Sequence, residues 1–475
     1  MLLLPILLPM IGGILLLFVP KDRVKIMSYV LMFLTVLLVV ALPFVVTERL
    51  VFGNFPFGVI FALDIDGFGI FFSYVFVLVW SFVLPYVHRY FQDDKESTRF
   101  FAFYITTLGA LVGVAYANNL ITLYMFFEFL GLCCIPLIAH ERSEESMRAC
   151  RKYLYYSVAG AFMGLTAIFY IFTLEIPQKF TAGGIPELLE HGDLNYLFVF
   201  TIVAVVGFAC KTGMFPLHAG LIAADPIAPD PATAVLSGIT TKAGVIVILR
   251  LLYYVVGADV LRGTFVQTWG LGLSMLTIFM GSLLASREKE LKSRLAYSTI
   301  SQVSYVIFGL FLFHPLGIVG AMLQVLFHAL AKTTLFLSAG TMIHETGEQR
   351  IAEFEGCGHA LKKTYLYFAV ASLSLIGLPF TGGFVSKWYI AVAAVKTGGI
   401  AIWGAGILVL SALLTAYYLF PIIIQGFLPE KKKIEATWKD SGFLVIWIVV
   451  LGVFPLPLID FCLTLVEVLG LGGGL

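Results

Sequence analysis

Long apolar runs, separated by short stretches rich in charge, proline or glycine, recur along the whole 475-residue chain. A run of about 20 apolar residues is long enough for one helix to cross a bilayer. The chain holds fourteen such runs, at 2–19, 27–46, 67–87, 100–117, 119–139, 153–174, 195–224, 231–256, 267–285, 296–313, 315–343, 364–393, 401–427 and 441–466. The sequence therefore predicts an all-α polytopic membrane protein with about 14 transmembrane helices.

Composition agrees with this class and excludes several others. Hydrophobic residues make up 60% of the chain and charged residues 12%, and a net charge of +1 gives no nucleic-acid footprint. The six cysteines lack the spacing of zinc or iron–sulfur ligands, and no Walker A sequence is present. We therefore expect no cofactor and no metal in this chain. The first run lacks a charged n-region, which predicts a retained helix.

The loops between the runs differ strongly in basic residues. Alternate loops, starting with the first, carry 21 Lys and Arg residues, ending with Lys431 to Lys433 and Lys439, whereas the opposite loops carry 4. Cytoplasmic loops hold the excess of Lys and Arg in membrane proteins. We therefore predict a multi-pass protein of the inner (cytoplasmic) cell membrane with both termini on the outer side.

Several charged residues lie inside the predicted spans. The basic ones are Lys211, Lys242, Arg250, Lys332 and Lys387. Among the acids, Glu128 lies at mid-span, and Asp460 in the last span is a weaker case. A charge at bilayer depth costs about 2.5–3.5 kcal/mol on insertion scales, so such residues indicate a functional site. A row of buried lysines with one carboxylate is typical of a proton relay, although a lysine that reaches the interface is the alternative for Lys211.

Two of these lysines lie beside predicted helix breaks. Lys211 precedes Pro216, and Lys387 follows Pro379 and the pair Gly382-Gly383. The two breaks are five spans apart, and an odd offset inverts a repeated unit across the membrane. We predict one membrane domain over 1–475, with helices 1–3 in 1–98, two inverted five-helix repeats in 99–258 and 265–428, and the last helix in 429–475. Coincidence between two proline-containing helices is the alternative.

The remaining candidates are placed by spacing and depth. Glu128 shares the depth of Lys211, so we expect a coupled pair, with a neutral hydrogen-bonded Glu128 as the alternative. His328 and Lys332 are at i and i+4, which puts both on one helix face, where an inert core histidine is the alternative. Arg250 fits a gate or an interfacial anchor equally well. His218 could cap carbonyls freed at the break or relay protons.

Sequence motifs in this order resemble a known family. They are the Glu128 helix, Arg151-Lys152-Tyr153, Lys-x-x-x-x-Pro-x-His at 211–218, Ala228-Pro229, Leu-Ser-Gly and Thr-Lys-Ala-Gly within 236–244, Arg-Leu-Ala-Tyr-Ser-Thr-Ile-Ser-Gln at 294–302, His-Ala-Leu-Ala-Lys at 328–332 and Gly-Leu-Pro-Phe-Thr-Gly-Gly-Phe-Val-Ser-Lys at 377–387. Over roughly 100–394 the chain resembles the antiporter-type membrane subunits shared by Mrp cation/proton antiporters, respiratory complex I and energy-converting membrane-bound hydrogenases.

The resemblance implies roles for the buried residues. Glu128 and Lys211 correspond to the family's essential pair, Lys242 to the central lysine, His328 and Lys332 to the second-half relay, and Lys387 to the terminal lysine. Two positions depart from the family pattern. Gly220 to Asp225 replaces a Trp-Leu-Pro-Asp-Ala-His stretch, which would rebuild the inner mouth of the polar path around Asp225. Phe380 replaces a second proline, which would make the second helix break milder. The chain resembles the shorter members, which lack a long lateral helix.

We therefore expect a proton-translocating subunit of a multisubunit complex, with Na⁺/H⁺ exchange left open. It would be driven by partner redox subunits or by a counter-ion gradient, since this chain shows no redox or hydrolytic centre of its own. Its partners would be other membrane subunits of an antiporter, an oxidoreductase or a hydrogenase. A self-contained solute carrier with a midplane substrate site, or a structural membrane anchor, is the alternative.

Overall fold

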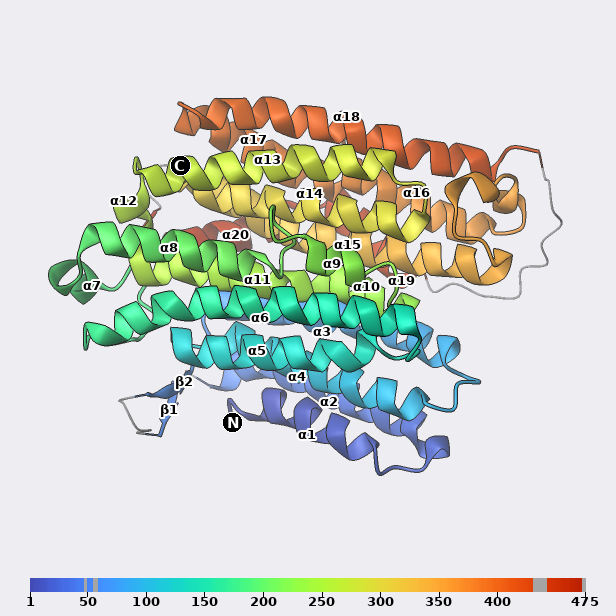
Figure 1. Ribbon diagram of the computed structural model, residues 1–475, viewed down its shortest axis with the longest axis horizontal. Helices are drawn as coiled ribbons and strands as arrows, with labels where there is room; N and C mark the ends of the chain where they lie inside the picture. The colour runs from blue at the N-terminus through green and yellow to red at the C-terminus, as the bar shows by residue number, and fades with distance from the viewer. Residues whose placement is uncertain (47–48, 54–58, 430–441, 472–475) are drawn as a thin grey trace. The chain divides into compact units, whose positions relative to one another are not determined.

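The computed structural model describes residues 1–46, 49–53, 59–429 and 442–471, and most of them are helical (Figure 1). Nine helices in these ranges are long and apolar enough to cross a membrane, or ten if one bent pair counts as a span. Two short strands, β1 (Leu50–Phe52) and β2 (Phe61–Leu63), pair antiparallel with Val51 opposite Ala62. The prediction of a helical polytopic membrane protein is confirmed, and the small hairpin is an addition to it.

The chain divides into two compact units. The first comprises Met1–Lys211, Ile227–Ala232 and Lys242–Leu261. Its helical elements are α1 (Leu4–Leu16), α2 (Lys21–Val45), α3 (Gly67–Tyr90), α4 (Ser97–Tyr116), α5 (Leu120–Ile138), α6 (Glu144–Thr173), α7 (Pro186–His191), α8 (Leu194–Ala209), most of α11 (Thr241–Arg250), the π-helical segment η3 (Leu251–Val256) and α12 (Ala258–Leu261). Within it α1 packs on α4, α4 on α5 and α6 on α8.

The second unit comprises Thr212–Pro226, Thr233–Thr241 and Arg262–Leu475. Its helical elements are α9 (Ala219–Ala224), the second half of α10 (Asp230–Val235), the π-helical segment η2 (Leu236–Thr240), α13 (Phe265–Arg287), α14 (Leu291–Phe311), α15 (Pro315–Thr346), the 3-10 turns η4 (Ile351–Glu353) and η5 (Cys357–His359), α16 (Lys362–Ile376), α17 (Gly382–Thr397), α18 (Ala401–Gly426), α19 (Phe443–Val453) and α20 (Leu456–Val468). Here α15 packs on α14, α16 and α17, and α13 packs on α14 and α18.

Local sequence explains where several of these helices begin. The side chains of Asp66, Asn119 and Ser143 accept hydrogen bonds from the backbone N–H of Gly69, Thr122 and Ser146, respectively. Each satisfies one of the donors that the first turn of a helix leaves without an intrahelical partner. These caps fix the starts of α3, α5 and α6.

Both predicted helix breaks are present. α8 ends at Ala209 and α9 begins only at Ala219, so Pro216 lies between them. α16 ends at Ile376 and α17 begins at Gly382, and Gly377 and Phe380 both have positive φ between them. The second helix is therefore fully interrupted, and Phe380 in place of a proline has not made the break mild.

The last apolar run differs from its prediction. The sequence predicts one helix over 441–466, but α19 and α20 meet at a bend of 76°. α19 ends at Val453 with Phe454 as its C-cap, and Pro455 follows directly before the first residue of α20. Proline lacks the N–H of a helical hydrogen bond and clashes with the carbonyl of the preceding turn, which ends the helix there. The start of the expected run, at residue 441, lies outside the described residues.

The close approach of α16 and α17 gives a testable consequence. A Cβ added at Gly383 would lie 1.7 Å from the backbone oxygen of Ser374, which no side-chain rotation can relieve. Overpacking of this kind costs about 1–3 kcal/mol. We expect Gly383→Ala to lower the melting temperature of the purified protein. Gly406→Ala is the matched control, because no atom lies within 4 Å of its added Cβ. Equal melting temperatures for the two variants would contradict this packing.

Candidate functional site

Lys211 lies just beyond the end of α8 and is buried within the first unit. Its Nζ donates a hydrogen bond to the hydroxyl of Tyr153 at 2.8 Å, and it lies 4.9 Å from the ring centroid of Tyr153 and 5.6 Å from that of Phe127. Gly131 makes room for it, since a Cβ there would be 2.9 Å from Nζ. The amine is therefore held by a neutral hydroxyl and two aromatic rings.

Glu128 lies on α5, one turn before Gly131. It is half-buried, and Lys211 is near enough to attract it electrostatically. The two do not form an ion pair within 4.0 Å in the part of the chain that the structure describes. The structure thus brings the two predicted partners to the same site without direct contact between their charged atoms.

Arg250, at the end of α11, is held in a buried ion pair. Its Nη1 and Nη2 donate to the carboxylate of Asp66 at 2.6 and 2.7 Å, and the hydroxyl of Tyr254 donates to the same carboxylate at 3.1 Å. Burial alone would raise the pKa of Asp66, but the charge and hydrogen bonds of Arg250 and the backbone N–H of Gly69 hold that pKa below its usual value. This geometry favours the anchor interpretation of Arg250.

Lys332 and His328 are buried on α15 in the second unit. The Nζ of Lys332 donates to the backbone oxygen of Leu295 at 2.7 Å and to the hydroxyl of Ser298. The fully buried Asp225 acts on Lys332 electrostatically. From the sequence, Asp225 is expected at the inner mouth of the polar path. The apolar stretch around it, Leu221 to Ala228, is the available signal for its burial.

Lys387, on α17, is held by the end of the preceding helix. Its Nζ donates to the backbone oxygens of Leu375 and, at 2.9 Å, of Ile376, and it lies 5.1 Å from the ring centroid of Tyr305. The last carbonyls of a helix have no intrahelical partner. The break between α16 and α17 therefore creates the acceptors that hold this lysine.

The other candidates have simpler surroundings. Lys242 is fully buried on α11, whereas Asp460 on α20 is exposed. The Nδ1 of His218 lies 3.1 Å from the backbone oxygen of Pro216, and its ring stacks on Phe215 at 4.4 Å. A contact with a carbonyl freed at the break favours the capping role for His218.

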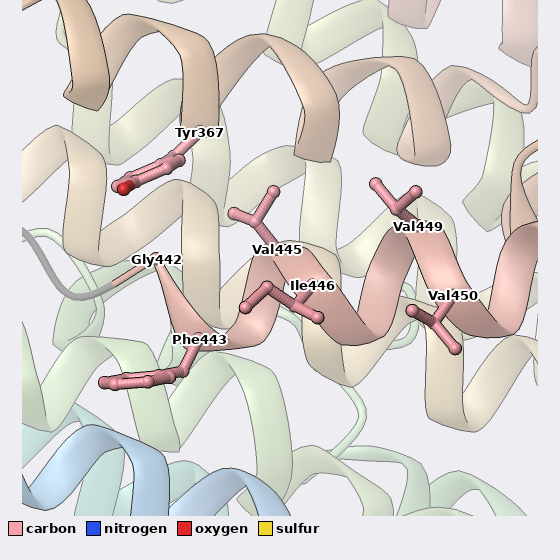
Figure 2. Close-up of a pocket in the computed structure, with 7 residues that line it drawn as sticks. All are labelled: Tyr367, Gly442, Phe443, Val445, Ile446, Val449 and Val450. Atoms are coloured by element: carbon pink, nitrogen blue, oxygen red, sulfur yellow. The ribbon is translucent and has the colours of Figure 1, made fainter.

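No group of three or more His, Cys, Asp or Glu residues that could hold a metal occurs among the described residues. A groove of about 510 Å³ lies between α16 and α19, lined by Tyr367, Gly442, Phe443, Val445, Ile446, Val449 and Val450 (Figure 2). Its lining is apolar apart from the tyrosine hydroxyl, and it includes none of the buried lysines. The groove is therefore distinct from the candidate ion site.

A family model described as NADH:quinone oxidoreductase/Mrp antiporter, TM, matches residues 117–415, which include every buried lysine named above. The chain belongs to this family. It is 33% identical over 349 residues to NADH-quinone oxidoreductase subunit N of Desulforudis audaxviator, covering 73% of this chain and 68% of that protein. It is 28% identical over 430 residues to one of the subunits of an Na(+)/H(+) antiporter of Alkalihalophilus pseudofirmus, covering 87% of this chain and 84% of that protein.

Solved structures of this antiporter-type family share the fold. A chain of the archaeal membrane-bound sulfane sulfur reductase superimposes with a TM-score of 0.88 at 21% identity, covering 98% of this chain and 97% of that one. A chain of respiratory complex I from Thermus thermophilus gives a TM-score of 0.85 at 23% identity over the full length of both. The protein is therefore an antiporter-like, multi-pass membrane subunit with buried charged residues.

The ion pair of Arg250 predicts a stability effect. Removing one partner of a buried ion pair costs about 3–5 kcal/mol of stability. Because Asp66 is partly exposed, we expect the cost for the Arg250–Asp66 pair to lie at the low end of this range or below it. We expect Arg250→Gln to lower the melting temperature, and Asp66→Asn/Arg250→Gln to recover part of the loss because no charge is left unpaired. Arg148→Gln is the control, since the Arg148–Glu144 pair is exposed. A double variant as unstable as the single one would contradict the account.

Proposed function

We propose that this chain translocates protons as a membrane subunit of a multisubunit complex. The observation that carries the proposal is the set of neutral acceptors around the buried Lys211 and Lys332 and the half-buried Lys387. A buried ammonium bound to a carboxylate leaves an unpaired buried anion when it loses its proton. An ammonium bound to hydroxyl and carbonyl oxygens leaves no anion in direct contact with it, so these lysines can give up and regain a proton at lower cost.

The relay has three further members in this proposal. Glu128 stabilises the charged form of Lys211, Lys242 receives the proton next, and His328 hands it on within the second unit. The inverted repeats at 99–258 and 265–428 form the two halves of the path, and the fourteen apolar runs form about fourteen crossings. Within the described ranges, helix length and apolar composition support nine or ten of these crossings.

The driving free energy comes from partners in this account. Relatives of the chain are named as subunits of NADH-quinone oxidoreductases and of an Na(+)/H(+) antiporter. We propose that partner redox subunits or a counter-ion gradient drive the chain, and that Na⁺ is exchanged for H⁺ where the host is an antiporter. A self-contained solute carrier is the competing function, and binding of an organic substrate by the isolated chain would favour it.

We also propose that both termini face outward, on the basis of the basic residues in alternate loops. Single cysteines in a cysteine-free background test this orientation. In sealed right-side-out cells, an impermeant maleimide should label Glu190→Cys and leave Glu144→Cys unlabelled until the membrane is opened. Both positions are exposed and described, whereas Lys431 to Lys433, the most basic stretch, lie outside the described residues. The reverse labelling pattern would invert the topology.

Glu128→Gln is the sharpest test of the relay. Gln keeps the shape and the hydrogen bonding of the side chain but cannot hold Lys211 in its charged form, so we expect loss of coupled ion transport with normal membrane insertion. Lys211→Met should have the same effect. The double variant should be no worse than either single variant, because groups that act as one unit are not additive.

The measurement is ion transport by vesicles that hold the full complex. Glu190→Gln and Lys179→Met are the matched controls, since both make the same chemical change at exposed positions. Transport at the parental rate in Glu128→Gln would show that the pair is structural and that the protons move elsewhere.

A further inference from the structure

A stripe of fully buried polar side chains runs along one face of α14. Ser298, Gln302 and Tyr305 are spaced i, i+4 and i+7, which places them on the same side of the helix. Ser298 accepts a hydrogen bond from Lys332, and the ring of Tyr305 lies 5.1 Å from the Nζ of Lys387. The stripe therefore has the buried Lys332 at one end, the half-buried Lys387 at the other and Gln302 between them.

A second stripe, on α15, meets the first at its centre. Gln324, His328 and Lys332 are spaced i, i+4 and i+8 on that helix, and all three are buried. The Nε2 of Gln324 donates to the Oε1 of Gln302 at 3.0 Å. The hydroxyl of Ser386, the residue before Lys387 in α17, donates to the Oε1 of Gln324 at 2.6 Å. Three helices are thus joined by hydrogen bonds between the two lysines.

Gln302 has one buried atom that the described part of the chain does not satisfy. Its Nε2 has no hydrogen-bond partner among the residues that the structure describes. Exchanging the oxygen and nitrogen of both amides would leave an unpaired Oε1 at the same place. A buried polar group left unsatisfied costs about 1–3 kcal/mol, and ordered water commonly satisfies such groups. The hydroxyls of Ser372 and Ser374 on α16 are likewise buried without a described partner.

We propose that Gln302, held in place by Gln324 and Ser386, binds a water molecule that carries protons between the His328–Lys332 pair and Lys387. The proposal rests on the proton-translocating function proposed above. The water accepts a proton on one side as it releases one on the other, so it is regenerated at each step and the amides stay neutral. Gln302 is a positioning residue, because it orients the water and exchanges no proton of its own.

Gln302→Leu tests the proposal, because Leu removes the hydrogen bonds of the amide from a similar volume. We expect proton transport by vesicles holding the full complex to fall about tenfold or more, in line with the loss of a positioned proton-transfer partner. Gln302→Asn, which keeps the amide, should retain most of the transport. Ser304→Ala is the control: Ser304 is buried on α14 but lies off the stripe, and its hydroxyl bonds only within its own helix.

A purely structural role for Gln302 gives different results. Leu takes the acceptor from the buried Nε2 of Gln324, so both roles predict some fall in melting temperature. A purely structural role predicts that transport falls only in proportion to the folded fraction of the protein. A high-resolution map should show water within about 3.2 Å of the Gln302 amide. Parental transport in Gln302→Leu, a fall in transport no larger than the loss of folded protein, or a dry amide would each overturn the proposal.

The Lys387→Met variant separates this inference from the proposed function. Loss of transport in Lys387→Met with parental transport in Gln302→Leu would overturn the water bridge alone. Parental transport in both variants, and in Glu128→Gln, would overturn the proton-translocating function itself.

Discussion

The structure depends on how a lysine ammonium is kept inside an apolar helical bundle without a carboxylate beside it. Lys387 shows the solution most clearly, since the interruption after Ile376 leaves helix-terminal carbonyls that accept its hydrogen bonds. The same interruption requires positive φ at Gly377 and Phe380 and contact between the backbones of α16 and α17 at Gly383. The free carbonyls at the helix break accept the hydrogen bonds of the ammonium, and the ammonium satisfies those carbonyls. Each group therefore offsets the free-energy cost of burying the other.

Much of this could be predicted from the sequence because it depends on single residues with strong local effects. Pro216 and Pro379 each lack a backbone donor and lie close to glycines that ease departure from helix geometry, so both interruptions were predictable. A proline without such neighbours need not end a helix, since Pro43 lies inside α2 and Pro421 inside α18. Lysine in such a run is equally conspicuous. Pro455 carries the same signal within the run 441–466, but no charge lies beside it to mark a break, and the length of the run favours a single helix.

The partners of the buried charges were not predictable, since they come from residues distant in sequence. Asp66 and Arg250 are 184 residues apart, and Asp66 looks like an ordinary helix cap until the fold brings the guanidinium to it. Tyr153, Ser298 and the carbonyl of Leu295 carry no sign in the sequence that they face an amine. Only the tertiary structure of each unit shows which hydroxyl or carbonyl replaces the expected carboxylate.

The lack of direct contact between the charged atoms of Glu128 and Lys211 affects how such a site could work. Two unit charges 4 Å apart attract by about 4 kcal/mol at an effective dielectric of 20, and the attraction falls as the distance grows. A pair in direct contact would be expensive to separate during each cycle. Lys211 is hydrogen-bonded to Tyr153, and Glu128 acts on it from beyond 4.0 Å. A small displacement of α5 or of the segment after α8 therefore changes the Glu128–Lys211 attraction by an amount comparable to the free energy of a proton transfer. Tyr153 thus keeps the amine in place whichever way the carboxylate moves, which lets the charge on Lys211 respond to Glu128 without loss of its hydrogen bond.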